Sequence, residues 1–251
     1  MGSGGFGAGP VESISVDGLT VTLGFSVRSS SHGCDGATAM VCGGSGVGQY
    51  SVISSTSDNG TVITLATPFD AHVLGGGKTT LCLTATVGSK LVTGNSFNWG
   101  MVVQWFGTTM MGVISDNDFT DMNVCSTGYG CKSGDGALEG FGLCYNGPEP
   151  LWMAEYTGNT FVRSNGIALK DSVVSNPQCN ASSYPGPFTR WQVVRRNSIA
   201  GVALSQTQCG TISLSGTSST DVVVENNTFG CPSSSVQPPI AVNCSHCRVQ
   251  G

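Results

Sequence analysis

The stretch DVVVENNTFG, residues 221–230, places three valines before two asparagines, and a phenylalanine two residues after Asn227. An apolar run followed by Asn-x-Phe or Asn-x-Ile also occurs at four earlier places in the chain. The asparagines of the five copies are Asn95, Asn117, Asn159, Asn197 and Asn227, and their successive spacings are 22, 42, 38 and 30 residues. One or two periods of about 21 residues, some lengthened by inserted loops, indicate a repeat architecture.

The residues around these copies predict which repeat it is. The apolar runs, such as TVITLA at 61–66 and WQVV at 191–194, are short, rich in β-branched residues and bounded by Gly, Asn, Ser and Asp. Such runs are typical of strands, and no segment of ten residues shows a helical period. We therefore predict an all-β fold, a single right-handed parallel β-helix in which each strand pairs with the equivalent strand one coil away.

The asparagine has a physical role in such a coil. Between two strands the backbone has to visit the left-handed region, which Asn tolerates better than most residues. Asparagines at equivalent places in successive coils can also stack and exchange side-chain amide hydrogen bonds. The Phe or Ile two residues later lies on the same side of the strand, so we expect it to point into the core.

Composition excludes several classes of protein. Glycine makes up 37 of 251 residues, which suits many tight turns. Charged residues are only 10% of the chain, against about 25% in ordinary proteins. The net charge is −5 and the basic residues form no cluster beyond Arg195 and Arg196, so binding to nucleic acid is not expected. The chain has no apolar stretch long enough to span a membrane.

The eleven cysteines favour an oxidising compartment, and their pairing cannot be deduced from spacing. We expect an extracellular or cell-surface protein, although the first residues contain no signal peptide. We interpret residues 1–10 as a flexible, glycine-rich lead-in and residues 11–251 as one β-helix domain, with inserted loops at about 124–152 and 172–190. Since a solenoid needs caps, we also expect a β-helix that is incomplete at one or both ends, and a monomer.

One stretch resembles a known family. Residues 44–73, GSGVGQYSVISSTSDNGTVITLATPFDAHV, contain Gly48-Gln49-Tyr50, two strand-like runs and Pro68-Phe69-Asp70. This pattern, with the coil repeats after it, is similar to the pectin-lyase-like right-handed parallel β-helix proteins over roughly residues 40–230. The resemblance implies a carbohydrate-active protein, because that superfamily includes pectate lyases and polygalacturonases beside non-enzymatic surface proteins.

Two kinds of cleavage chemistry are common in this family. Lyases hold Ca²⁺ and a uronate with acidic residues and use Arg or Lys as base, whereas hydrolases use paired carboxylates as acid and base. Asp116 and Asp118, in SDNDFTD, would share one face of a strand, or would be solvated acids that flank the turn at Asn117. The specific motifs of polygalacturonases and pectate lyases are absent, so neither activity is singled out.

The first inserted loop supplies the other site candidates. Asp135 and Glu139 are acidic residues that could act in catalysis together with Asp116 and Asp118. Aromatic side chains can stack on sugar rings, and carboxylates can bind the hydroxyl groups of a sugar. The predicted substrate-binding residues are Trp105, Tyr145, Trp152 and Glu155. The alternative is a disulfide-pinned loop whose aromatic residues belong to the core. The Cys244–Cys247 pair lacks the second ligand pair of a zinc site, so we predict no metal site and no definite cofactor; Ca²⁺ is the one candidate.

We therefore expect a protein that binds or cleaves a polysaccharide, of the lyase or glycoside hydrolase type if it is an enzyme. The alternatives are a non-catalytic surface or structural module and a truncated relative without activity. A groove-facing cluster of carboxylates would favour the enzyme, whereas acids scattered on turns would favour the non-catalytic module.

Overall fold

The computed structural model describes residues 5–27, 34–72, 79–85, 88–99, 103–106, 109–122, 138–144, 148–173, 189–201, 210–215, 221–230, 240–242 and 246–251. Every element assigned in these ranges is a β-strand. The described chain accordingly contains no helix with the length and apolarity required to cross a membrane. The chain forms two compact units: Met1–Val87 with Gly142–Pro150 and Ser172–Phe188, and Gly88–Phe141 with Leu151–Asp171 and Thr189–Gly251.

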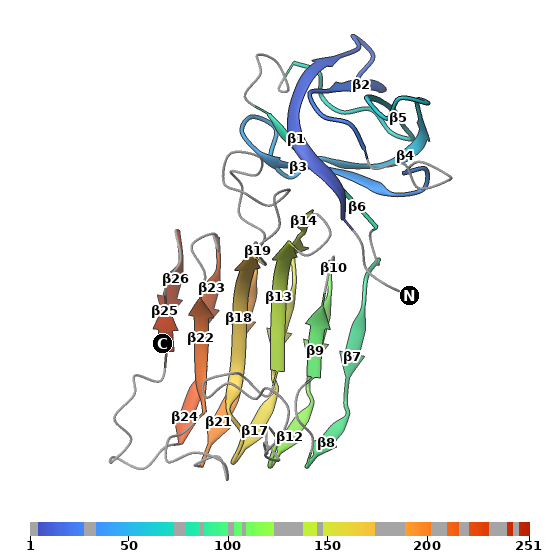
Figure 1. The fold of residues 1–251 in the computed structure, drawn as a ribbon. Helices are drawn as coiled ribbons and strands as arrows, with labels where there is room; N and C mark the ends of the chain where they lie inside the picture. Colours follow the sequence, from blue (N-terminus) through green and yellow to red (C-terminus); the bar gives the residue numbers. More distant parts are fainter. Residues whose placement is uncertain are drawn as a thin grey trace. The chain divides into compact units, whose positions relative to one another are not determined.

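The first unit is a closed antiparallel barrel (Figure 1). Its strands follow one another around the barrel in the order β1, β2, β5, β4, β3, β6. Their bounds are β1 (Gly5–Ile14), β2 (Thr20–Leu23), β3 (Thr38–Gly43), β4 (Tyr50–Thr56), β5 (Val62–Leu65) and β6 (Thr80–Thr84). Closure leaves no free sheet edge.

Alternation of side chains builds the core of this barrel. Val21, Ile53 and Ile63 are completely buried, while the residues on either side of each are more exposed. The β4–β5 turn is held by Asn59, whose Oδ1 accepts hydrogen bonds from the Ser57 hydroxyl and the Thr61 N–H. Gly60 supplies the positive φ of +69° that this turn requires.

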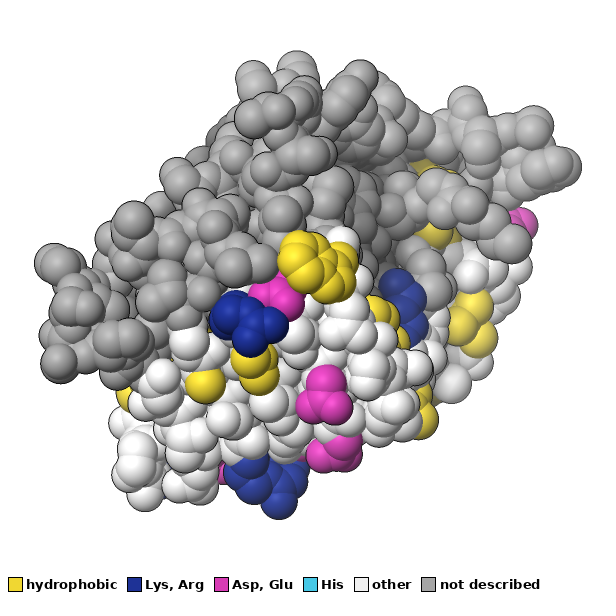
Figure 2. Space-filling model, turned by 90° about the horizontal axis from the view of Figure 1, so that it is seen from below, with side chains coloured by type: hydrophobic (Ala, Val, Ile, Leu, Met, Phe, Trp, Pro, Cys, Tyr) yellow, Lys and Arg dark blue, Asp and Glu magenta, His cyan; other side chains and the backbone are white. Residues whose placement is uncertain are grey.

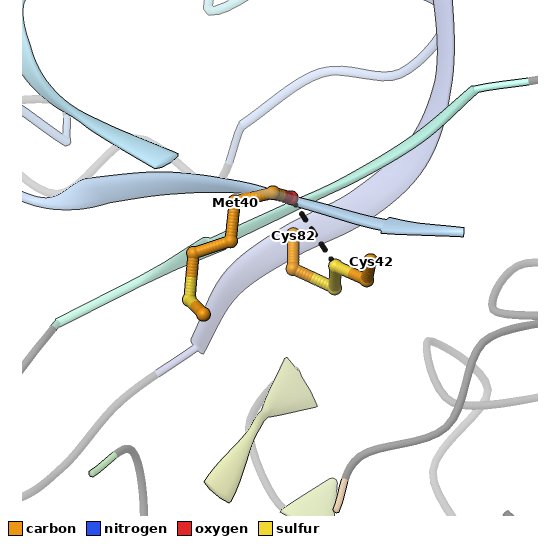
Figure 3. Close-up of a disulfide and its surroundings, with 3 residues drawn as sticks. All are labelled: Met40, Cys42 and Cys82. Atoms are coloured by element: carbon orange, nitrogen blue, oxygen red, sulfur yellow. Dashed lines mark hydrogen bonds between the residues drawn. A yellow bond between two sulfur atoms is a disulfide. The ribbon is translucent and has the colours of Figure 1, made fainter. Parts of the chain in front are cut away.

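A disulfide between Cys42 and Cys82 joins β3 to β6 (Figure 3). Cys42 lies where the register of β3 against β6 shifts, between Val41 and Gly43. Its sulfur lies 3.2 Å from the Met40 carbonyl oxygen (Figure 3), and both cysteines are completely buried. Among the described residues, Cys34 is a free, buried cysteine of this unit.

The residues that carried the family resemblance meet within the barrel. Gln49 Oε1 accepts a hydrogen bond of 2.7 Å from the Asp70 N–H. Phe69, the residue before Asp70, is buried and donates its N–H to the Gly18 carbonyl. This stretch therefore forms antiparallel strands and their connections.

The second unit is a parallel β-helix, which confirms the predicted fold class. Its strands stack side by side from β7 and β8 to β25 and β26 (Figure 1), each paired in parallel and in register with the equivalent strand one coil away. We number its sheets 1 to 4 in the order in which a coil passes through them.

The four sheets have the following strands. Sheet 1 contains β10 (Thr109–Met110), β15 (Leu151–Trp152) and β19 (Thr189–Arg190). Sheet 2 contains β7 (Leu91–Thr93), β11 (Val113–Ser115), β16 (Glu155–Thr157), β20 (Val193–Arg195), β23 (Val223–Glu225) and β26 (Arg248–Gln250). Sheet 3 contains β8 (Ser96–Asn98), β12 (Asp118–Thr120), β17 (Thr160–Val162), β21 (Ser198–Ala200) and β24 (Thr228–Gly230). Sheet 4 contains β9 (Val103–Phe106), β13 (Leu138–Cys144), β18 (Gly166–Val173), β22 (Thr211–Ser215) and β25 (Ile240–Val242), and β14 (Pro148–Glu149) pairs antiparallel with the end of β13.

The five repeated asparagines form a ladder at the corner between sheets 2 and 3. Asn159 Oδ1 accepts hydrogen bonds from the N–H and the Nδ2–H of Asn117, at 3.1 and 3.0 Å. Asn159 Nδ2 in turn donates to Asn197 Oδ1 and to the Ile114 carbonyl, both at 3.0 Å. The same pattern links Asn95 to Asn117 and Asn197 to Asn227. The predicted ladder is thus present through the five coils from Asn95 to Asn227.

The residue two places after each ladder asparagine points into the core. Phe97, Phe119 and Phe161 stack with ring centroids 5.1 and 4.7 Å apart, and Ile199 and Phe229 continue the same column. This column packs against inward residues of sheets 2 and 4.

The left-handed corner position differs from the one we predicted. Positive φ values occur at the residue before each ladder asparagine, not at the asparagine itself. These residues are Gly94, Asp116, Gly158, Arg196 and Asn226. The ladder asparagine is instead fixed by its buried amide bonds, so its residue type is set by hydrogen bonding and not by backbone conformation.

Two further expectations are corrected. The lead-in predicted for residues 1–10 is strand β1 from Gly5 onward. The predicted single β-helix domain over residues 11–251 is wrong for the first unit, whose barrel strands all pair antiparallel. Most of the loops predicted at 124–152 and 172–190 lie outside the described residues.

Candidate functional site

The structure does not describe every predicted site residue. Asp135 and Tyr145 lie outside the described residues. Glu139 and Trp105 lie on the paired strands β13 and β9, of which the structure describes the backbone, with Glu139 opposite Gln104 and Gly140 opposite Trp105. Their predicted roles in catalysis and sugar binding therefore stay predictions.

Trp152 is part of the core. Its side chain is completely buried, and its ring makes an edge-to-face contact with Trp191 at 5.3 Å between centroids. A ring without exposed surface has no face for a sugar to stack on, so the predicted substrate contact at Trp152 is corrected to the alternative, a core aromatic residue.

Glu155 lies at the start of β16 and is paired with an arginine. Arg195, one coil further, donates hydrogen bonds from Nε and Nη2 to Glu155 Oε1, at 2.9 and 2.5 Å. Both side chains are partly exposed. The pair bridges two strands of sheet 2, and the carboxylate is therefore already occupied by a partner.

Asp116 and Asp118 are both exposed, on either side of the buried ladder residue Asn117. Asp116 has the left-handed conformation, with φ of +54°. Asp118 is the first residue of β12, on the outer face of sheet 3. Neither carboxylate has a hydrogen bond or ion pair with the residues that the structure describes. Both are therefore free to accept hydrogen bonds from a ligand.

The outer face of sheet 3 is lined by small polar side chains. Ser96, Asp118, Thr160, Ser198 and Thr228 occupy the same strand position in five successive coils. Neighbouring strands lie about 4.8 Å apart, so these oxygen-bearing side chains repeat regularly along the solenoid. Figure 2 views the molecule from below, and the described part of the surface in it is largely uncharged, with a few acidic and basic side chains.

One edge of this face carries an acid and a base on either side of a glycine. The corner between sheets 2 and 3 contains Asp116, Gly158 and Arg196 in successive coils, all with positive φ. A β-carbon at Gly158 would collide with Asp116 Oδ1, so the glycine makes room for this carboxylate. Arg196 is exposed and donates a hydrogen bond of 3.3 Å to the Thr157 hydroxyl.

The opposite edge, the corner between sheets 3 and 4, contains Trp99, Asp121 and Arg163. Arg163 binds Asp121 through two parallel hydrogen bonds, from Nε at 2.7 Å and from Nη2 at 2.6 Å. These hydrogen bonds hold the pKa of Asp121 below its ordinary value and raise the pKa of Arg163. Trp99 is 69% exposed.

Sequence reasoning missed Trp99 and favoured other tryptophans. The signal was present, because Trp99 directly follows SFN, the strand of the first Asn-x-Phe copy, and so falls on a corner and not inside a strand. Trp152 lies instead inside a strand of sheet 1, where both residues are buried.

In the described ranges, no three His, Cys, Asp or Glu side chains gather closely enough to hold a metal ion. The acids are distributed over corners and strand starts, and Asp121 and Glu155 are neutralised by arginines.

Comparison with solved structures finds low similarity to two phage tailspike proteins. It is similar to the tailspike protein gp49 from Pseudomonas phage LKA1, with a TM-score of 0.29 and 10% identity, over 98% of this chain and 42% of that one. It is similar to tailspike gp61 from Pseudomonas phage phi297, with a TM-score of 0.31 and 11% identity, over 97% of this chain and 57% of that one. The chain thus spans about half the length of these structures. No family model and no curated protein matches the sequence.

Proposed function

We propose that the chain is a carbohydrate-binding parallel β-helix protein, related to the pectin-lyase-like proteins, that holds a polysaccharide against the outer face of sheet 3. The observation that carries the proposal is the column Ser96–Asp118–Thr160–Ser198–Thr228 on that face. Its hydroxyl and carboxylate groups repeat at the strand spacing, and a polysaccharide also presents hydroxyl groups at a regular repeat.

Binding without cleavage is the form of this proposal that the geometry supports best. Hydrolysis needs two carboxylates that face one bond, one of them protonated. Asp121 and Glu155 are held by arginines, and a carboxylate in an ion pair is a poor proton donor. We further propose that the protein acts outside the cell, as a monomer, and that its partner is a polysaccharide.

The test compares two sets of isosteric changes in the full chain. Thr160→Val with Ser198→Ala removes two hydroxyls from the outer face of sheet 3. Thr211→Val with Ser213→Ala removes the same groups from β22 of sheet 4, where they alternate with the buried Ile212 and Leu214 in the same way. Affinity is measured by native electrophoresis in gels that contain neutral or acidic polysaccharides.

We expect the sheet 3 variant to bind about thirtyfold more weakly, since the two lost hydrogen bonds contribute about 1 kcal/mol each. The sheet 4 variant should bind like the wild type. If the sheet 3 variant binds no more weakly than the sheet 4 variant, the ligand lies elsewhere. A folded wild type that binds no polysaccharide in a broad panel would favour the purely structural module.

Cleavage is the second candidate, favoured by the two exposed carboxylates of Asp116 and Asp118. Reducing ends and absorbance at 235 nm are measured together, with and without Ca²⁺. A rise in both indicates β-elimination, and reducing ends alone indicate hydrolysis. Activity that survives Asp116→Asn with Asp118→Asn would exclude these two residues as the catalytic pair.

A further inference from the structure

At the corner between sheets 3 and 4, three successive coils each contribute one residue: the exposed Trp99, then Asp121 and Arg163, which form an ion pair. Trp99 donates its backbone N–H to Thr120, the residue before Asp121, and Asp121 donates its N–H to Val162, the residue before Arg163. The three corner residues are therefore stacked in register. Figure 2 shows a hydrophobic side chain next to an adjoining acidic and basic pair on this face.

The ion pair presents its positive partner to solvent. The Arg163 side chain is 46% exposed, whereas that of Asp121 is 5% exposed. Arginine has five N–H donors, and two of those of Arg163 bind Asp121. The other three have no hydrogen bond to the residues that the structure describes, so they can reach a ligand.

The next coil leaves space beside this arginine. Gly201 follows Arg163 in the corner column, with φ of +79°, and a β-carbon there would lie 3.3 Å from Arg163 Cγ. The guanidinium is thus fixed by Asp121 on one side and is not crowded by a side chain from Gly201 on the other.

Trp99 completes the arrangement two strand spacings away from Arg163, about 10 Å along the solenoid. A tryptophan this exposed offers a large apolar face with a polar N–H, and such a face fits the apolar side of a pyranose ring. A ring stacked on the indole would lie one strand spacing from the corner residue Asp121 and two from Arg163.

We propose that Trp99 and Arg163 form a binding subsite for a pyranose unit that carries an anionic group, carboxylate or sulfate, with Asp121 as a positioning residue for the guanidinium. The proposal rests on the proposed function and deepens it, because it assigns a charge class to the ligand and an edge of sheet 3 to its recognition. A guanidinium that is pre-oriented by a buried carboxylate loses little freedom when it binds an anion.

The experiment uses the full chain and matched pairs of polysaccharides: polygalacturonate against its carboxyl-reduced form, and dextran sulfate against dextran. The variants are Trp99→Ala and Arg163→Gln with Asp121→Asn, which removes both charges and leaves no buried carboxylate unpaired. Arg248→Gln, at an exposed arginine of sheet 2, is a control that removes one positive charge elsewhere. Circular dichroism and urea unfolding establish that each variant is folded.

The wild type should bind at least one anionic form about tenfold more tightly than its neutral counterpart. The Arg163/Asp121 variant should lose this preference and keep its affinity for the neutral form, and Trp99→Ala should weaken binding to both forms. Preference for carboxylate alone or for sulfate alone identifies the anion.

The failure of this inference is distinguishable from failure of the proposed function. Equal binding of anionic and neutral forms by the wild type, or an unchanged preference in the Arg163/Asp121 variant, overturns the subsite and leaves carbohydrate binding intact. An equal loss of preference in Arg248→Gln overturns it too, because an arginine outside this corner would then matter as much as Arg163. Absence of binding to every polysaccharide overturns both.

Discussion

At the scale of single residues, Asn159 shows why the repeat keeps its asparagine. The side chain is completely buried, and it satisfies the Asn117 N–H and the Ile114 carbonyl, which are backbone groups of the previous coil. An alanine would bury both without partners. The ladder thus satisfies backbone groups that the corner withdraws from the sheet hydrogen bonds.

Asn159→Ala should therefore lower the free energy of unfolding by about 3 kcal/mol, since each orphaned buried group costs about 1–3 kcal/mol. Asn95→Ala is the matched control. Asn95 is at the exposed end of the ladder and donates to Asn117 Oδ1 and Thr93, so we expect a loss of about 1 kcal/mol. Urea unfolding of both variants measures the difference. Equal losses of unfolding free energy would contradict the idea that the buried asparagines of the ladder stabilise the fold more than the exposed one.

The ion pair of Asp121 with Arg163 should make the stability of the protein depend on pH. The hydrogen bonds from Arg163 lower the pKa of Asp121 in the folded protein below the ordinary value of 3.8. The stability that this shift contributes is fully present above pH 3.8 and is lost as the pH falls from there through the depressed folded pKa.

Wild type and Asp121→Asn are compared by urea unfolding between pH 7 and pH 2. The difference in unfolding free energy should be constant from pH 7 to about pH 5 and should shrink below the ordinary carboxyl pKa. A difference that does not change down to pH 2 would mean that the pKa of Asp121 is the same in the folded and unfolded states.

At the scale of elements, the two-residue alternation of apolar side chains predicted where the strands lie. It did not predict which strands pair with one another. TVTL in β2 and VVR in β20 both alternate buried and more exposed residues, yet β2 pairs antiparallel and β20 parallel. Alternation states which side chains face the core. The direction of pairing depends on connections, and only the Asn-x-Phe copies provided a signal for a coil.

The corners explain which site residues could be predicted. Asp116 was identifiable because it adjoins a ladder asparagine. The left-handed position before that asparagine is filled by Gly, Asp, Arg and Asn in different coils, so its composition gives no pattern to read. Trp99 was missed for the same reason, since a corner tolerates many exposed side chains and only the structure shows which of them are neighbours.

At the scale of the whole molecule, the chain combines two architectures with separate cores. One core cluster gathers the inward side chains of the barrel, and the other gathers those of the β-helix. The sequence predicted the second through its repeats. It did not predict the first as a separate unit, because low charge, frequent glycine and short β-branched runs are shared by both.

Removal of the Cys42–Cys82 disulfide can show whether the two cores unfold independently. Cys42 and Cys82 close a loop of 40 residues within the barrel, and such a cross-link stabilises by about 4 kcal/mol. All four tryptophans lie in residue ranges of the β-helix unit. Their fluorescence therefore reports on that unit, while hydrogen exchange at β3 and β6 reports on the barrel.

Cys42→Ala with Cys82→Ala should accelerate hydrogen exchange in β3 and β6 and leave the urea midpoint of tryptophan fluorescence unchanged. Cys34→Ala is the control, because it removes a buried sulfur from the same unit without breaking a disulfide, and it should change exchange much less. A fluorescence midpoint that falls in parallel with barrel protection would show that barrel and β-helix unfold as one cooperative structure, in which the disulfide stabilises the proposed carbohydrate-binding face as well.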